Sequence, residues 1–92
     1  MAQQVLSEET RQDLLRRLRR IEGQARGVQR MVEDGRDCGE IISQLASIRA
    51  ATHSAGIFVL RHYAKRCAAD ALPQDAPEQH IEDLIDLMLR VS

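Results

Sequence analysis

The composition of this 92-residue chain excludes several fold classes before any motif is considered. Its length suits a single domain over residues 1–92, with no room for a second core. One Phe, one Tyr, no Trp, five Gly and two Pro supply too few aromatic and turn residues for a β-sandwich or barrel. The abundant Ala, Leu, Arg, Glu and Gln are helix formers, so we expect an all-α fold. A core this small also favours oligomerisation.

The formal charge of −1 excludes a histone-like polycation, but the charges are unevenly distributed. Residues 11–36 hold eight Arg and four acids, whereas residues 70–92 hold six acids and one Arg. A basic face that binds a phosphate backbone is therefore compatible with the near-neutral total. No apolar run approaches a membrane span, and no N-terminal stretch resembles a secretion signal. We expect a cytoplasmic protein with no membrane partner.

A first amphipathic helix is expected over about residues 7–34, with Ser7 followed by acids at its start. Its apolar residues recur at spacings of three and four and form one stripe: Leu14, Leu18, Ile21, Ala25, Val28 and Val32. The opposite side carries arginines, with Arg17 on its flank: Arg16, Arg19, Arg20, Arg26 and Arg30. Five arginines without compensating acids on that face favour a polyanionic partner over a merely solvated surface. Gly23 and Gly27 fall on the same face, where a close backbone approach would offset their helix cost of about 1 kcal/mol each.

A second, longer helix is expected over about residues 38–70 and a third over about residues 77–91. Gly35 is predicted to end the first helix. Asp37 is predicted to cap the second, with Glu40 completing a capping box, which places Cys38 in the first turn. The small side chains of residues 50–56 predict close packing of another helix. Pro77 suits the first turn of the third helix.

The two cysteines cannot meet within one chain if the second helix is continuous. Cys38 and Cys67 are 29 residues apart, so they share nearly the same azimuth at about 43 Å separation. A disulfide requires Cα atoms within about 7 Å. Antiparallel pairing of two such helices instead places Cys38 opposite Cys67 of a second copy, with the crossing at residues 52–53. This predicts a symmetric dimer with two equivalent dithiol sites.

The surroundings of both thiols favour reactivity over the alternative of ordinary apolar burial. The N-terminal end of a helix stabilises a thiolate at Cys38, and the neighbouring Lys65 and Arg66 stabilise one at Cys67. The matched azimuth and the small crossing segment further favour a functional pair.

The residues near Cys67 make metal binding the weaker prediction. Tyr63 occupies the position four residues before Cys67, where a further ligand on the same face would lie, and Tyr is a poor ligand for soft copper. His62 points about 140° away from Cys67 on the helix. His53 and His80 are interpreted as packing or surface residues. Two thiolates alone can still hold Cu(I).

Three segments together resemble the CsoR/RcnR/FrmR family of repressors, over roughly residues 10–90. They are RLRRIEGQ at residues 17–24 followed by Gly27, EDGRDC at residues 33–38, and SQLASIR at residues 43–49. The resemblance implies a disc-shaped helical tetramer, a dimer of antiparallel dimers, that represses transcription. It also implies binding to pseudo-palindromic operator DNA, and release when an inducer reacts at a cysteine site between protomers.

The sensing positions resemble the CstR-type branch, which detects persulfides and other reactive sulfur species. Copper sensors of the family use Cys, His and Cys, where this chain has Cys38, Tyr63 and Cys67. They also use a Tyr and a Glu beside the ligands, where this chain has Asp37 and Asp83. Nickel and cobalt members replace the second Cys, and formaldehyde members lack it. The resemblance implies no cofactor and release of DNA when sulfane-sulfur donors persulfidate or cross-link the two cysteines. The alternative is a Cu(I)-responsive repressor of copper-resistance genes that uses the same thiolates.

The family resemblance also implies operator contacts at Arg17 and Arg49, with supporting phosphate contacts from Arg16, Arg19 and Arg20. Because no helix-turn-helix is expected, a broad basic face that recognises duplex shape is favoured. Two other classes compete with a repressor: a small thiol enzyme or sulfur carrier, and a scaffold dimer with inert cysteines. The chain has no CxxC motif and no residue set that orients a substrate, so we expect no enzymatic activity.

Overall fold

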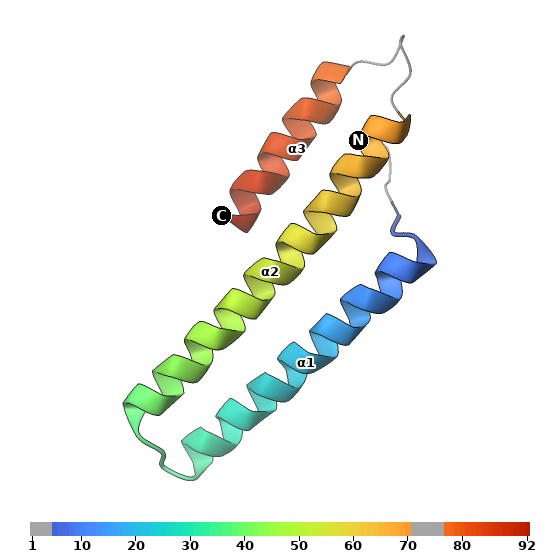
Figure 1. Ribbon diagram of the computed structural model, residues 1–92. Coiled ribbons are helices and arrows are strands. Elements are labelled where there is room, and N and C mark those ends of the chain that lie inside the picture. Colours follow the sequence, from blue (N-terminus) through green and yellow to red (C-terminus); the bar gives the residue numbers. More distant parts are fainter. Residues whose placement is uncertain (1–4, 71–76) are drawn as a thin grey trace.

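The protein is all-helical in the computed structural model, which describes residues 5–70 and 77–92, with the backbone alone for residues 67–70 and 77–80. In these ranges it forms three helices and no strand: α1 Glu8–Glu33, α2 Cys38–Asp70 and α3 Pro77–Val91 (Figure 1). The three-helix prediction is confirmed, with bounds within one residue of those expected. None of the described helices combines the length and apolarity needed to cross a bilayer.

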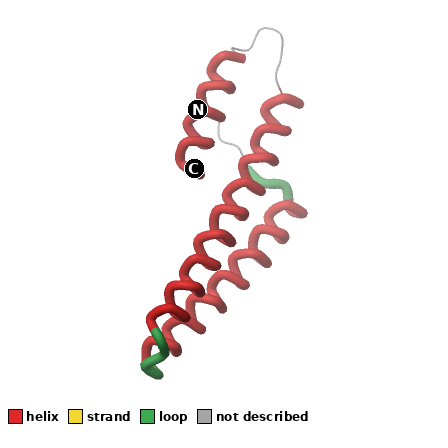
Figure 2. Tube along the Cα trace, turned by 60° about the vertical axis from the view of Figure 1, so that its left-hand side comes forward, coloured by secondary structure: helices red, strands yellow, loops and turns green. Residues whose placement is uncertain are grey.

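α2 is the central element and packs against both other helices (Figures 1 and 2). α1 and α2 form a long antiparallel hairpin, and α3 returns along the C-terminal half of α2 on the side away from α1 (Figure 1). In the described ranges α1 and α3 do not pack against each other. The result is a flat, elongated protomer of 60 × 26 × 15 Å.

α1 ends in the turn that its sequence predicts. Gly35 adopts φ = 67°, the left-handed region that glycine enters without a steric cost. Its N–H donates to the Val32 carbonyl at 3.2 Å, and the Arg36 N–H donates to the Met31 carbonyl at 2.9 Å. These two bonds are the Schellman pattern, which satisfies the last carbonyls of a helix.

Replacing Gly35 by Ala is expected to lower the free energy of unfolding by about 1–2 kcal/mol, because Cβ disfavours the left-handed backbone. Gly23→Ala is the matched control with the opposite sign. Gly23 lies inside α1, with no atom within 4 Å of an added Cβ, so Ala should stabilise the helix by up to about 1 kcal/mol. Urea unfolding of both variants at one protein concentration measures the two effects. Equal shifts of the same sign would contradict this account of the turn.

α2 begins at Cys38 with Asp37 as its cap. Asp37 Oδ2 accepts a hydrogen bond from the Gly39 N–H at 2.9 Å, and the Asp37 carbonyl accepts the first helical bond. The predicted cap is confirmed, but the predicted capping box is wrong, because Asp37 accepts from Gly39 and not from the Glu40 N–H. The Glu40 carboxylate accepts from Arg36 Nε at 3.0 Å, so it pairs across the turn and does not return to the Asp37 backbone.

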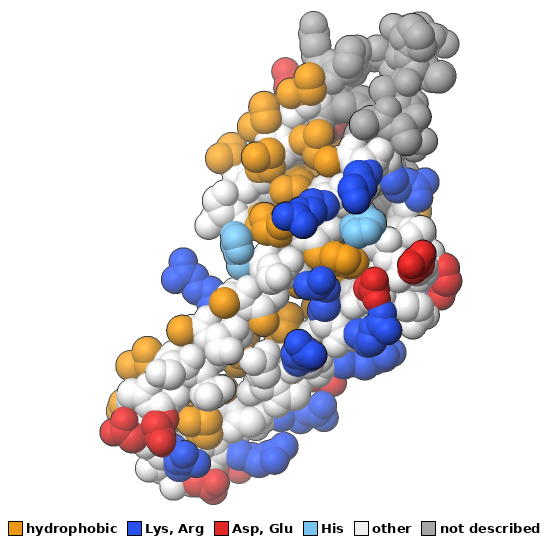
Figure 3. Space-filling view, in the orientation of Figure 1, with side chains coloured by type: hydrophobic (Ala, Val, Ile, Leu, Met, Phe, Trp, Pro, Cys, Tyr) orange, Lys and Arg blue, Asp and Glu red, His pale blue; other side chains and the backbone are white. Residues whose placement is uncertain are grey.

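A single protomer has very little core. Among the described apolar residues only Val28 and Ala55 are buried, at 8% and 5% exposure. Large apolar side chains are exposed along α3 and the first turns of α2 (Figure 3): Ile42, Leu45, Ile81, Ile85, Met88 and Leu89. Apolar surface of this extent on a small chain is typical of an association surface.

The close packing predicted at small residues of α2 is found at Gly56, but the close approach predicted at Gly23 and Gly27 is not found. At Gly56, an added Cβ would lie 3.2 Å from Val91 Cγ1, so the small segment of α2 accommodates the end of α3. At Gly23 and Gly27 no atom lies within 4 Å of an added Cβ. The predicted close backbone approach at these two glycines is therefore absent within the protomer.

Candidate functional site

The cysteines lie near opposite ends of one unbroken helix. α2 runs from Cys38 to Asp70 without interruption and includes Cys67, so the two Cα atoms are about 43 Å apart. The continuity on which the interchain prediction depends is therefore confirmed. The side chain of Cys38 is exposed in the protomer, whereas that of Cys67 is outside the described residues.

The first turn of α2 surrounds Cys38 with carboxylates that already have partners. Asp37 is used as the helix cap. A hydrogen bond from Arg36, together with its positive charge, holds the pKa of the Glu40 carboxyl below its ordinary value. The Cys38 thiol therefore lies at the positive end of a helix. The carboxylates of Asp37 and Glu40 beside it already accept hydrogen bonds from Gly39 and Arg36.

The α2 face that carries the cysteines is only partly covered. At about 100° per residue, Leu45, Arg49 and Tyr63 lie within about 40° of Cys38. The end of α3 packs on this face at Gly56 through Val91 and extends beside Arg49, whereas Leu45 is left 51% exposed. The first turns of α2, from Cys38 to Leu45, are thus left uncovered within the protomer.

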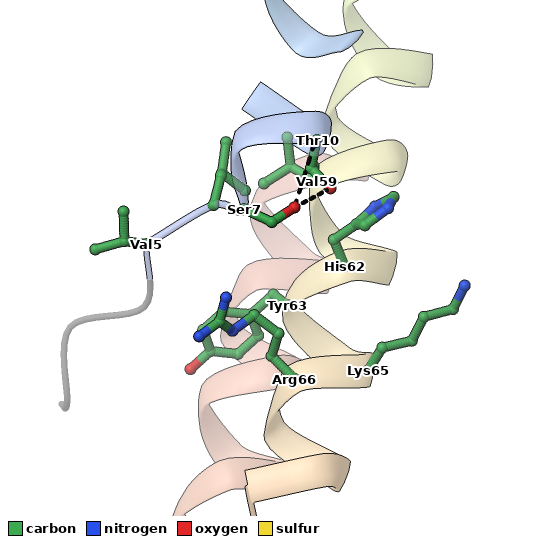
Figure 4. Close-up of a pocket in the computed structure, with 9 residues that line it drawn as sticks. Val5, Ser7, Thr10, Val59, His62, Tyr63, Lys65 and Arg66 are labelled. Carbon is green, nitrogen blue, oxygen red and sulfur yellow. Dashed lines mark hydrogen bonds between the residues drawn. The ribbon is translucent and has the colours of Figure 1, made fainter. Parts of the chain in front are cut away.

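Tyr63 lies beside a cavity of about 190 Å³ between the start of α1 and the C-terminal part of α2 (Figure 4). Val5 and Thr10 line it from the α1 side, and Val59 and Arg66 line it with Tyr63 from α2. Tyr63 is half-buried, as is Asp83 on α3, and His53 is exposed.

Within one protomer, the described side chains bring no group of three or more His, Cys, Asp and Glu residues together. Cys67 and His80 lie outside the side chains so described. A site that joins Cys38 to a second thiolate therefore has to take that thiolate from another copy of the chain, since Cys67 of the same helix is too distant.

Arg17 of α1 contacts an aromatic ring on α2. Its guanidinium carbon lies 4.3 Å from the centroid of the Phe58 ring on α2, a cation–π contact. Phe58 in turn packs on the His62 ring at 4.6 Å between centroids, and the Phe58 carbonyl is 2.9 Å from His62 Nδ1. The α1 arginine is thereby fixed to the surface of α2.

Two other arginines of the predicted basic face of α1 form ion pairs with acids on the same helix. Arg16 forms an ion pair with Asp13, and Arg26 forms one with Glu22 at 3.2 Å. The prediction of a basic face without compensating acids is wrong for these two. In the part of the chain that the structure describes, four α1 arginines make no ion pair: Arg17, Arg19, Arg20 and Arg30.

The predicted DNA contacts fall into two separate groups. Arg16, Arg17 and Arg20 line one hollow on α1. Arg49 lies on the α3 side of α2, beside Val91. The structure thus brings Arg16, Arg17 and Arg20 together, but it does not bring Arg49 to them within one protomer. Arg19 is exposed on α1 and does not line this hollow.

Two cations that the sequence prediction did not place on the DNA face lie next to Arg17. Arg61 and Lys65 line the same groove as Arg17 and Phe58, and Figure 3 shows Lys and Arg side chains gathered along α1 and the neighbouring part of α2. The spacing of residues 54, 58, 61 and 65 by three and four, which places them on one helix face, was the available sequence signal.

Comparisons with known proteins agree with this fold. The family model described as metal-sensitive transcriptional repressor matches residues 10–90. The chain is 38% identical over 81 residues to the copper-sensing transcriptional repressor CsoR of Bacillus subtilis, which covers 88% of this chain and 80% of that protein. Among solved structures, CsoR with Cu(I) from Geobacillus thermodenitrificans has a TM-score of 0.83 at 38% identity, with 96% of this chain and 92% of that chain covered. The nickel-responsive transcriptional regulator InrS has a TM-score of 0.79 at 30% identity, with both chains fully covered. The chain therefore belongs to the family of metal-sensitive transcriptional repressors.

Proposed function

We propose that this chain is an operator-binding repressor that responds to Cu(I) through Cys38 of one protomer and Cys67 of another. The observation that carries the proposal is the unbroken α2, which separates the two thiols within a chain and presents Cys38 on an uncovered helix face. The named relatives are copper- or nickel-responsive. They support the copper alternative better than the reactive-sulfur prediction.

The proposed assembly is an antiparallel α2 dimer that pairs into a tetramer. The exposed apolar side chains on α3 and the first half of α2 support it, because burial of about 25 cal/mol per Å² of apolar surface would stabilise the complex. In such a dimer, each end of the α2 pair holds one Cys38 and one Cys67. The inducer then acts between protomers and changes how their arginine surfaces are spaced.

The donor set fits Cu(I) with two thiolates. Soft thiolate ligands select Cu(I) over harder divalent ions, whereas the phenol of Tyr63 is a poor third ligand. Bound Cu(I) would supply a link between the two sulfur atoms. The chain's own contribution is to present both thiols at matched azimuth. It also keeps the two carboxylates beside Cys38 hydrogen-bonded, that of Glu40 to Arg36 and that of Asp37 to the Gly39 N–H.

Reactive-sulfur sensing is the second candidate function. It is favoured by Tyr63, which stands where copper sensors of the family have a histidine ligand. The Cys38 thiolate would attack a sulfur of an inorganic polysulfide, breaking an S–S bond and expelling a shorter polysulfide anion. The Cys67 thiolate of the second copy would then attack the Cys38 persulfide and expel hydrosulfide. The product is an interchain disulfide, or a longer sulfur bridge when the attacked chain is longer.

Operator binding itself is tested by salt dependence. The parent should lose affinity for its duplex steeply as salt rises, because binding displaces counterions from the phosphates. Arg17→Ala should weaken binding and reduce the slope of log affinity against log salt by about 0.9 for each phosphate that is no longer neutralised. Arg49→Ala should weaken binding as well. Fluorescence anisotropy measures both, with helix content checked by circular dichroism. If both variants bind like the parent, the proposed DNA surface is wrong.

A further inference from the structure

The groove between α1 and α2 holds a second group of cations in addition to the α1 arginines. Arg17, Phe58, Arg61 and Lys65 line it together, with Ser54, Ile57 and His62. Arg61 and Lys65 are exposed. They lie one helical turn apart on α2, on the side that faces α1 and away from α3.

These cations are not neutralised by the protein. In the described part of the chain neither Arg61 nor Lys65 forms an ion pair, in contrast to Arg16 and Arg26 on α1. Holding three unpaired cations around one groove is electrostatically unfavourable until a polyanion binds there. Lys65 was expected to act on the Cys67 thiolate, but its place in this groove gives it a second role.

We infer that Arg61 and Lys65 bind the operator's phosphate backbone together with Arg17, which Phe58 positions. The inference rests on the proposed repressor function and extends its DNA surface from α1 onto α2. Four residues of helix rise span about 6 Å, close to the rise of two base pairs along a strand. Each of the two side chains can therefore contact its own phosphate.

The proposed contacts are sequence-independent. Cations that contact only phosphates orient a protein on the duplex and add affinity, but they read no base edges. Loss of Arg61 and Lys65 is therefore expected to weaken binding to operator and non-operator duplexes by a similar factor. The factor should fall as salt rises, because it comes from counterion release.

The Phe58 ring is assigned a positioning role. A cation–π contact at a partly exposed site is worth about 0.5–1 kcal/mol, or about two- to fivefold in binding. Phe58→Leu keeps apolar bulk and should weaken operator binding by up to about fivefold, with little change in salt slope because Arg17 retains its charge. Phe58→Tyr keeps a ring and should restore parental affinity, which a purely volumetric role would not predict.

The decisive experiment compares, on one duplex, how steeply the affinity of the parent tetramer and of its variants depends on salt. The double variant Arg61→Gln with Lys65→Gln should have a slope shallower by about 1.8 for each protomer in contact, and bind at least about tenfold more weakly at 0.1 M salt. The swapped variant Arg61→Lys with Lys65→Arg keeps both charges and should retain the parental slope. Arg90→Gln removes a charge from α3, beyond α2 from this groove, and should also retain it.

The outcomes separate the inference from the proposed function. A double variant with the parental slope, while Arg17→Ala still lowers it, would overturn the inference and leave operator binding intact. A parent whose duplex binding does not depend on salt would overturn the proposed function itself. A swapped variant that loses the slope with unchanged oligomeric state would show that shape, and not charge, matters at these positions, which also overturns the inference.

Discussion

An equimolar mixture of the Cys38→Ala and Cys67→Ala proteins is expected to form one covalent cross-link per dimer after subunit exchange and treatment with polysulfide. Each variant supplies the thiol that the other lacks, at one end of the antiparallel α2 pair. Each variant alone should remain monomeric on a non-reducing denaturing gel, because its identical cysteines lie at opposite ends of the pair, about 43 Å apart. The expected change is from no dimer band to a dominant one.

The parent protein and a mass measurement provide the controls. The parent should cross-link at both ends of the dimer, with zero to several inserted sulfur atoms. Cys67→Ala should stop at a persulfide on Cys38, which is the exposed thiol at the helix start, and Cys38→Ala should react slowly. A link between Cys38 and Cys67 of one chain would be incompatible with the continuous α2 and with the antiparallel pairing.

Tyr63→His is expected to raise Cu(I) affinity by at least about tenfold, because imidazole adds a third donor one helical turn from Cys67. Competition with a chromophoric Cu(I) chelator measures the affinity, and X-ray absorption should change from two sulfur ligands to two sulfur and one nitrogen. Tyr63→Phe, which keeps the ring but lacks the phenol oxygen, is the matched control and should bind like the parent.

Two results would contradict a Cu(I) site made of two thiolates alone. A parent that already binds Cu(I) through three ligands, with no gain from Tyr63→His, would show that another donor completes the site. A large loss of affinity in Tyr63→Phe would assign the phenol oxygen as that donor. Either result would refute the two-thiolate site.

The helices and their ends follow from local sequence, which is why they could be predicted closely. The spacing of apolar residues by three and four is a property of neighbouring residues, and it located all three helices. Gly35 and Asp37 act within the α1–α2 turn itself. Glu40 was assigned wrongly because Arg36, its actual partner, is only one residue further away than Asp37 and carries a charge that the Asp37 N–H lacks.

The composition of the basic groove depends on how α1 packs against α2, so local sequence predicted it only in part. Arg17 was expected to contact DNA, but its contact with Phe58 joins residues 41 positions apart. The spacing of Arg61 and Lys65 by four places them on one face of α2, but it does not show that this face lies beside α1. Only the hairpin geometry places them beside Arg17.

The identity of the inducer depended on one residue. Tyr63 led the sequence interpretation towards reactive sulfur, whereas the named relatives support metal sensing. The two thiols are common to both candidates. Cu(I) is therefore preferred to reactive sulfur as the proposed inducer, and the proposed site remains Cys38 with Cys67 of a second copy.

Operator release by Cu(I), followed on the reduced tetramer with intact mass recorded on the same samples, tests the central claim most directly. We expect the parent to release its duplex when about one Cu(I) per protomer is added, with no covalent change, and Cys38→Ala and Cys67→Ala to stay bound. Polysulfide in place of Cu(I) should release DNA only with a mass increase or an interchain link. Release by either agent from a variant that lacks both cysteines, or full retention of DNA by the parent with both agents, would contradict the account.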